Sequence, residues 1–134
     1  MYSSFDISVL SHATEDEDKL LNCLKTHLGR FSNLKKVELI KTEGHWKNPI
    51  IRINLHYTKN SDSLYSEVVD RLSHIYGKDD LKSYLDNNVD EKGSVYLRLD
   101  KQKLCSGELS ISEKDSVRLV FKRKGKFSNN NDIV

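Results

Sequence analysis

Apolar and polar residues alternate in several short stretches of the chain, and this period of two is typical of strands with one buried face. In the first stretch, Phe5, Ile7 and Val9 alternate with polar residues. The pattern predicts four further strands, at about 34–42, 50–57, 94–99 and 117–122. We therefore expect a sheet of about five strands.

Leucines at helical spacing predict two main helices between these strands. The first covers about 15–28 and has a capping box at its start, formed by Thr14 and the glutamate three residues later. Ser61 or Asp62 can cap the second, which ends at Gly77. Both helices are amphipathic, so each should place one face on the sheet.

The remaining segments complete an α+β arrangement. A short helix begins near Asp79, and the connection before the last strand holds a brief helical turn or an extra strand. Glycine, asparagine and proline in 43–49 predict a turn, so the second and third strands should form an antiparallel hairpin with Trp46 at its tip. We predict a two-layer sandwich over residues 1–124, mostly antiparallel, with the helices on one face. The tail, 125–134, lacks periodicity and is expected to be disordered.

Alternation also divides the strand side chains between the two faces of the sheet. The apolar set, which should meet the helices, is Phe5, Ile7, Val9, Ile51, Ile53, Leu55, Val95, Leu97, Leu99, Val117, Leu119 and Phe121. The opposite set is Asp6, Ser8, Arg52, Asn54, His56, Tyr96, Arg98, Arg118 and Lys122. Cations beside an aromatic ring can pair with phosphates and stack on unpaired bases. An ordinary solvated sheet face explains the same composition equally well.

The charge of the chain is unevenly distributed. The formal net charge is +2, yet residues 98–126 hold nine basic and four acidic residues, which leaves 13 basic and 16 acidic residues elsewhere. The first segment is therefore +5 and the remainder −3. Clustered cations are typical of polyanion-binding surfaces, and also of a solvated C-terminal half.

The sequence lacks the motifs of several other functional classes. It contains no glycine-rich phosphate loop, no GxSxG and no HExxH, so we predict a protein that is not an enzyme and needs no cofactor or metal. Cys23 and Cys105 show no paired spacing and are expected to be reduced. A chain of 134 residues is expected to form one domain. The sequence has no apolar run long enough to span a membrane, and it does not start with the basic and then apolar residues of a signal peptide, so a cytoplasmic protein is expected.

Three segments together form a recognisable pattern: 7–18 before the first helix, the hairpin 44–50, and 97–102 with a later Gly-Glu pair. They resemble a family of small archaeal proteins described as predicted RNA-binding or exosome-associated subunits. The resemblance spans about residues 5–122. It implies a fold like that of ribosomal protein L5, a role in RNA processing, and site residues His45, Asn48, Asp100, Lys101 and Gln102. For Asp100 and Gln102, capping of a local turn is the alternative role.

These observations predict a non-catalytic RNA-binding protein that is an accessory factor in RNA processing and associates with the exosome. The alternative is an adaptor that docks on a larger RNA-processing or ribosome-related complex through the Trp46 hairpin. RNA and the exosome are the expected partners, and a homodimer stays open. The predicted RNA contacts are His45, Trp46, Lys47, Arg52, Tyr96, Arg98, Lys101, Gln102, Arg118 and Lys122.

Overall fold

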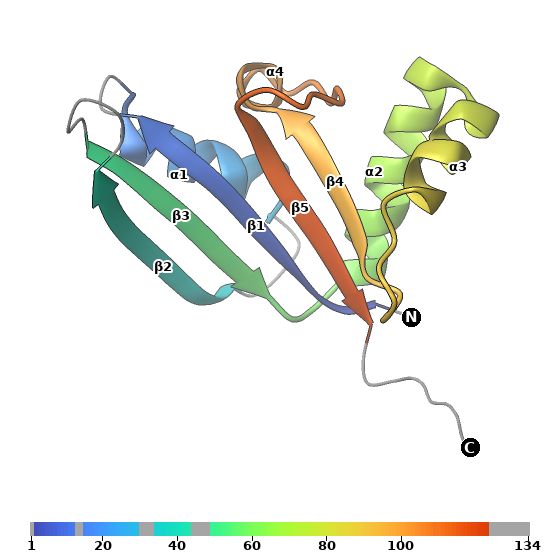
Figure 1. Cartoon of the computed structure of the whole chain (residues 1–134), viewed down its shortest axis with the longest axis horizontal. Helices are drawn as coiled ribbons and strands as arrows, with labels where there is room; N and C mark the ends of the chain where they lie inside the picture. The colour runs from blue at the N-terminus through green and yellow to red at the C-terminus, as the bar shows by residue number, and fades with distance from the viewer. Residues whose placement is uncertain (1, 13–14, 30–33, 44–48, 124–134) are drawn as a thin grey trace.

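The computed structural model describes residues 2–12, 15–29, 34–43 and 49–123. One five-stranded sheet, in the order β2-β3-β1-β5-β4, has antiparallel pairing throughout (Figure 1). Its strands are β1 (Tyr2–His12), β2 (Leu34–Glu43), β3 (Pro49–Tyr57), β4 (Val95–Asp100) and β5 (Ser116–Arg123). The helices are α1 (Glu17–His27), α2 (Ser61–Tyr76), α3 (Lys78–Asp86) and α4 (Lys101–Cys105). The predicted α+β fold and the β2-β3 hairpin are confirmed.

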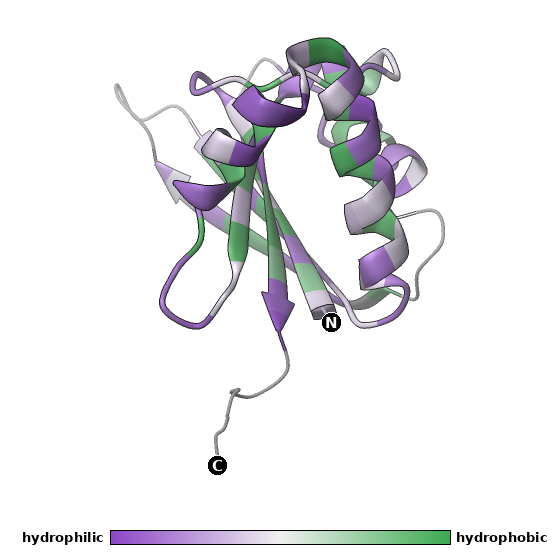
Figure 2. Cartoon of the chain, turned by 90° about the vertical axis from the view of Figure 1, so that its right-hand side faces the viewer, coloured by the Kyte–Doolittle hydropathy of each residue, from purple (hydrophilic) through white to green (hydrophobic). Residues whose placement is uncertain are grey.

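The helices lie to one side of the sheet. Both α1 and α2 contact β1, while α3 follows α2 and lies beside β4 (Figure 1). Figure 2, turned by 90°, shows polar and apolar positions alternating along the strands, with α2 to one side of them. The other side of the sheet carries no helix among the described residues, so its side chains face solvent.

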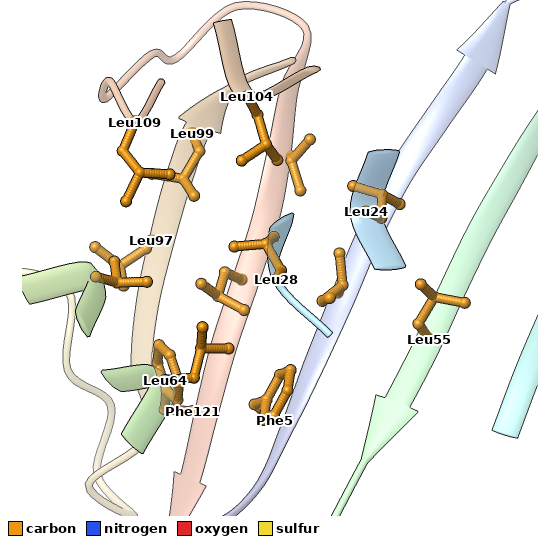
Figure 3. Packing of buried hydrophobic residues seen from close by; sticks show 14 of the residues in the cluster. Phe5, Leu24, Leu28, Leu55, Leu64, Leu97, Leu99, Leu104, Leu109 and Phe121 are labelled. Carbon is orange, nitrogen blue, oxygen red and sulfur yellow. The ribbon is translucent and has the colours of Figure 1, made fainter. Parts of the chain in front are cut away.

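The core fills the space between the sheet and the helices (Figure 3). Every residue predicted on the apolar face is buried except Ile51, which is half-buried. The ring of Phe5 stacks on that of Tyr57 at a centroid distance of 4.8 Å, and Phe121 packs beside it. Each such side chain contributes roughly 1.5–3 kcal/mol on burial. The amphipathic pattern therefore determines which face of the sheet stays open.

The helix ends differ in part from those expected. The side chain of Asp16 caps α1, because it accepts hydrogen bonds from the backbone N–H groups of Asp18 and Lys19 at 3.0 and 3.2 Å. Thr14, the predicted cap, lies outside the described residues. Helix α2 begins at Ser61 with Asn60 in the N-cap position, so neither Ser61 nor Asp62 is the cap as predicted. The helix ends at Gly77 as predicted, where a φ of +88° favours glycine.

The prediction of two reduced cysteines is wrong. Cys23 in α1 and Cys105 at the end of α4 form a disulfide, and their Cα atoms are 5.2 Å apart. The two residues are 82 positions apart in the sequence, so only the packing of α4 beside α1 brings them together. This bond links the start of the chain to the segment between β4 and β5.

No helix in the described ranges is long and apolar enough to cross a bilayer.

Candidate functional site

The register of the sheet arranges the solvent-facing side chains, here called the open face, in rows that run across the strands. In one row Arg98 lies opposite Arg118, and Arg118 lies opposite Ser8. The row continues through Asn54 to Glu38 on the edge strand. We call it the arginine row.

A neighbouring row begins at Tyr96 on β4 and crosses Val120 and Asp6. It ends with His56 and Lys36. Side chains in adjacent rows of a face are about 7 Å apart, within reach of long side chains. The two rows therefore form one continuous surface of cations, carboxylates and neutral polar groups, with the phenol ring of Tyr96 among them.

Two arginines directly opposite each other are the most unusual feature of this surface. Like charges at such positions repel each other and destabilise a sheet. The Nε atom of Arg98 is 3.5 Å from a carboxylate oxygen of Glu113, and since both side chains are exposed this pair contributes little. Within the described part of the chain, Arg118 has no ion pair. The arginine row thus keeps an excess of positive charge.

Arg118 has an aromatic neighbour instead of a carboxylate. Its guanidinium carbon lies 5.1 Å from the centre of the Tyr96 ring, a cation–π geometry. The Tyr96 hydroxyl donates a hydrogen bond to Asp90 at 3.0 Å. This hydrogen bond, with some burial, raises the pKa of Tyr96. The ring and the guanidinium are therefore held in place at neutral pH.

A carboxylate, Asp6, lies near the centre of the open face. It accepts a hydrogen bond from Lys122 Nζ at 2.6 Å and contacts the Nδ1 atom of His56. Burial would raise the pKa of Asp6, but the hydrogen bonds and positive charges of Lys122 and His56 outweigh burial and lower it. Asp6 is therefore ionised at neutral pH and neutralises Lys122.

Arg52 adds a further cation from β3. Its side chain is exposed, lies opposite Leu10 and Ile40, and has no ion pair among the described residues. A depression of about 540 Å³ extends along this part of the face. Its charged lining residues are Lys36, Arg52, Arg118, Lys122, Asp6 and Glu38, four cations against two carboxylates. Such a surface can bind an anion by charge and hydrogen bonding.

The structure brings together five of the predicted contacts on this face: Arg52, Tyr96, Arg98, Arg118 and Lys122. Lys36, Asn54 and His56 lie among them and were not predicted as contacts. Alternation had already assigned Asn54 and His56 to this face, but they were not named as contacts. The predicted contacts His45, Trp46 and Lys47, together with Asn48, lie outside the described residues.

Gln102 and Lys101 lie away from the open face. Gln102 is in α4 and lines a cavity beside α1 with Cys105. Asp100 caps α4, because its carboxylate accepts a hydrogen bond from Lys103 N at 2.9 Å. Turn capping, the alternative role for Asp100, is thus confirmed.

The expectation that Lys101 contacts RNA is corrected by its burial. The side chain is only 4% exposed, and its ammonium donates hydrogen bonds to the carbonyl of Leu10 at 3.0 Å and to Glu15 at 2.9 Å. Both carboxylate oxygens of Asp115 are 3.0 Å away. With His12, 3.2 Å from Asp115, these residues form what we call the lysine cluster.

The lysine cluster joins parts of the molecule that are distant in sequence. It connects the end of β1, the residue before the α1 cap, α4 and the turn before β5. His12, Glu15 and Asp115 are residue types that bind metals, and their ligand atoms lie within 4.8 Å of one another. Here Glu15 and Asp115 contact the ammonium of Lys101, which supplies the positive charge, and His12 contacts Asp115. The cluster is therefore structural in the arrangement observed.

Solved structures share this fold. Mth689, a DUF54 protein from Methanothermobacter thermautotrophicus, superposes with a TM-score of 0.71 over 94% of this chain and 88% of that chain, at 24% identity. SSO0741 from Sulfolobus solfataricus, also DUF54, gives a TM-score of 0.70 over 91% of this chain and 88% of that chain, at 24% identity. Identities this low establish the fold alone. The likeness to ribosomal protein L5 stays a prediction.

Sequence relatives are more informative. The chain is 35% identical over 116 residues to the RNA-binding protein PAB1135 of Pyrococcus abyssi, and the aligned region covers 83% of this chain and 74% of that protein. It is 33% identical over 129 residues to the uncharacterized protein MJ0213 of Methanocaldococcus jannaschii, covering 92% and 86%. Residues 4–123 match a family model described as RNA binding. The chain therefore belongs to this RNA-binding family, with archaeal relatives.

Proposed function

We propose that the chain binds RNA through the open face, with Arg98, Arg118 and Arg52 as the main phosphate contacts. The observation that carries this proposal is the pairing of Arg98 with Arg118 across adjacent strands. Such a pair destabilises the free protein, and an anion between the two guanidinium groups would relieve the repulsion. The family and the Pyrococcus relative are named for RNA binding, which supports RNA as the anion.

The mode of binding follows from the kind of side chains on the face. Arginine forms bidentate hydrogen bonds with phosphate, and such contacts carry little sequence information. Among the described residues of the two rows, Tyr96 is the one tyrosine, phenylalanine or tryptophan, so stacking contributes at one base at most. We therefore expect salt-dependent binding with modest sequence preference, and binding rather than catalysis as the activity.

A titration with a matched charge control tests this proposal. Fluorescence anisotropy with labelled single-stranded and duplex RNA would compare the wild type with the Arg98→Gln, Arg118→Gln double variant. The control is Lys78→Gln with Lys82→Gln on α3, which removes the same charge from exposed positions outside the two rows. Since a hydrogen bond to a charged group contributes about 1.5–3 kcal/mol, the arginine variant should bind about tenfold more weakly or worse.

The control variant should bind within about threefold of the wild type, because it leaves both rows intact. Equal loss in both double variants would contradict the proposal and indicate a general charge effect. Absence of RNA binding by the wild type at low salt would also contradict it.

We further propose that this binding serves RNA processing in the cytoplasm, as an accessory factor of the exosome. The resemblance of residues 7–18, 44–50 and 97–102 to the exosome-associated pattern supports this role. Purification of the chain from native cells with nuclease treatment tests it, since exosome subunits should remain bound after the RNA is digested. A Trp46→Ala variant that loses these subunits but keeps its RNA affinity would favour the adaptor role instead.

A further inference from the structure

The two edges of the sheet differ in how well they are covered. The β4 edge is partly closed, because Tyr96 N–H donates a hydrogen bond to the carbonyl of Asn88 at 2.9 Å and Val89 bridges to Val95. Strand β2 forms the other edge and has ten residues. In the described part of the chain only β3 pairs with β2, so its outer edge is unpaired.

Large apolar side chains are exposed on both faces of β2. Val37 and Leu39 lie opposite the buried Leu55 and Ile53, and hence on the helix side of the sheet, yet Leu39 is 52% and Val37 43% exposed. Ile40 lies on the open face and is 44% exposed. Free edge strands of monomers are usually short, charged or interrupted by proline. Strand β2 does carry lysines and glutamates, but it is ten residues long and exposes three large apolar side chains between them. This combination indicates a strand that is covered in solution.

We propose that β2 pairs with β2 of a second copy of this chain, antiparallel, about a twofold axis at Leu39. The register of β2 shifts between Leu34 and Lys36, so the regular part of the strand is 36–43. In an antiparallel pair, opposite residues share a face, so the axis of a symmetric pair coincides with one residue position. An axis at Leu39 brings residues 36–42 of both copies into the ladder.

The charges of β2 are compatible with this axis. Leu39 lies against its symmetry mate, Val37 against the aliphatic stem of the partner's Lys41, and Lys36 against the partner's Thr42. No two like charges are directly opposite. An axis at Glu38 would place two carboxylates face to face, and an axis at Lys41 would do the same with two ammonium groups, which is destabilising. The axis at Leu39 therefore brings no like charges together, and it also buries Leu39, the most exposed apolar residue of β2.

The dimer would join two sheets into one, with both open faces on the same side. Arg118 on β5 is separated from its symmetry mate by seven strand spacings, or roughly 34 Å at about 4.8 Å each. The two arginine rows would then form one long basic surface. Dimer formation does not depend on RNA binding, so the two proposals can fail separately.

The test is the mass of the protein in solution. Sedimentation equilibrium of the wild type up to about 200 µM, where a dimer with a micromolar Kd is populated, should give twice the monomer mass. Leu39→Lys should give the monomer, because it places two ammonium groups opposite each other at the axis. The matched control is Ile75→Lys on α2, which charges a residue that is 58% exposed and should leave the dimer intact.

Circular dichroism checks that each variant is folded. Ile40→Glu, which places a carboxylate opposite the partner's Glu38 on the other face of the same strand, replaces Leu39→Lys if that variant unfolds. A monomeric wild type overturns the proposal, and so does a dimer that survives the charged residue in β2. Loss of the dimer in Ile75→Lys would place the interface elsewhere and overturn it as well. If β2 instead pairs with a strand of another protein, the purified wild type is a monomer, and the proposal is overturned.

Discussion

Replacement of Lys101 by methionine tests whether the lysine cluster holds the fold together. Methionine keeps most of the apolar stem but removes the ammonium that contacts Leu10, Glu15 and Asp115. Removing one partner of a fully buried ion pair costs roughly 3–5 kcal/mol. Glu15 is about one third exposed and Asp115 about half, so water can replace part of the interaction. We therefore expect the free energy of unfolding to fall by about 2–3 kcal/mol.

The pH dependence of this loss identifies its cause. Burial would raise the pKa of Asp115, but hydrogen bonds from Lys101 and His12 and their positive charges outweigh burial and lower it. A carboxylate with a lowered folded-state pKa stabilises the fold at pH values above its unfolded pKa, and the stabilisation is lost as the pH falls through the folded value. The difference in free energy of unfolding between the wild type and Lys101→Met should therefore be largest near neutral pH and should decrease below about pH 4.

Urea unfolding from about pH 7 to pH 2, followed by circular dichroism, measures this difference directly. The control is Lys103→Met in the same short helix, where the side chain is exposed and the change should be within about 0.5 kcal/mol. A Lys101→Met variant as stable as the control at pH 7 would show that the lysine cluster does not stabilise the fold. A difference that stays constant down to pH 2 would show that packing, rather than charge, is responsible.

Two further predictions concern stability. The disulfide between Cys23 and Cys105 closes a loop of about 80 residues in the unfolded chain, so its reduction should lower the free energy of unfolding by on the order of 4 kcal/mol. An unchanged urea midpoint in dithiothreitol would contradict this prediction. Gly29→Ala should cost about 2 kcal/mol or more, because a Cβ there would lie 2.6 Å from Cζ of the buried Tyr57 ring. A melting temperature equal to that of the wild type would show that the ring can move aside.

Alternation predicted both faces of the sheet because side-chain direction in a strand depends only on local geometry. Arg98 and Arg118 could be assigned to the open face in this way. That they lie directly opposite each other depends on the register of β4 and β5, which local pattern leaves open. The sequence could therefore predict which residues lie on the open face, but not which of them lie opposite each other.

Interactions between distant segments could not be predicted from local pattern. Lysine is rarely buried, so Lys101 was expected at the surface, yet its partner Glu15 is 86 residues away. Cys23 and Cys105 lacked any spacing signal for the same reason. The resemblance to the family did indicate that 7–18 and 97–102 matter, and both segments contribute to the lysine cluster. In the structure these two segments are joined by the hydrogen bonds of Lys101.

If the arginine row binds RNA phosphates, RNA binding depends on salt in a way that Arg98 and Arg118 determine. For single-stranded RNA, the slope of log K against log salt changes by about 0.7 for each phosphate contact. The Arg98→Gln, Arg118→Gln variant should therefore have a slope shallower by roughly 1.4 than that of the wild type. An unchanged slope, or an equal change in the Lys78→Gln, Lys82→Gln control, would mean that the arginine row does not contact the phosphates.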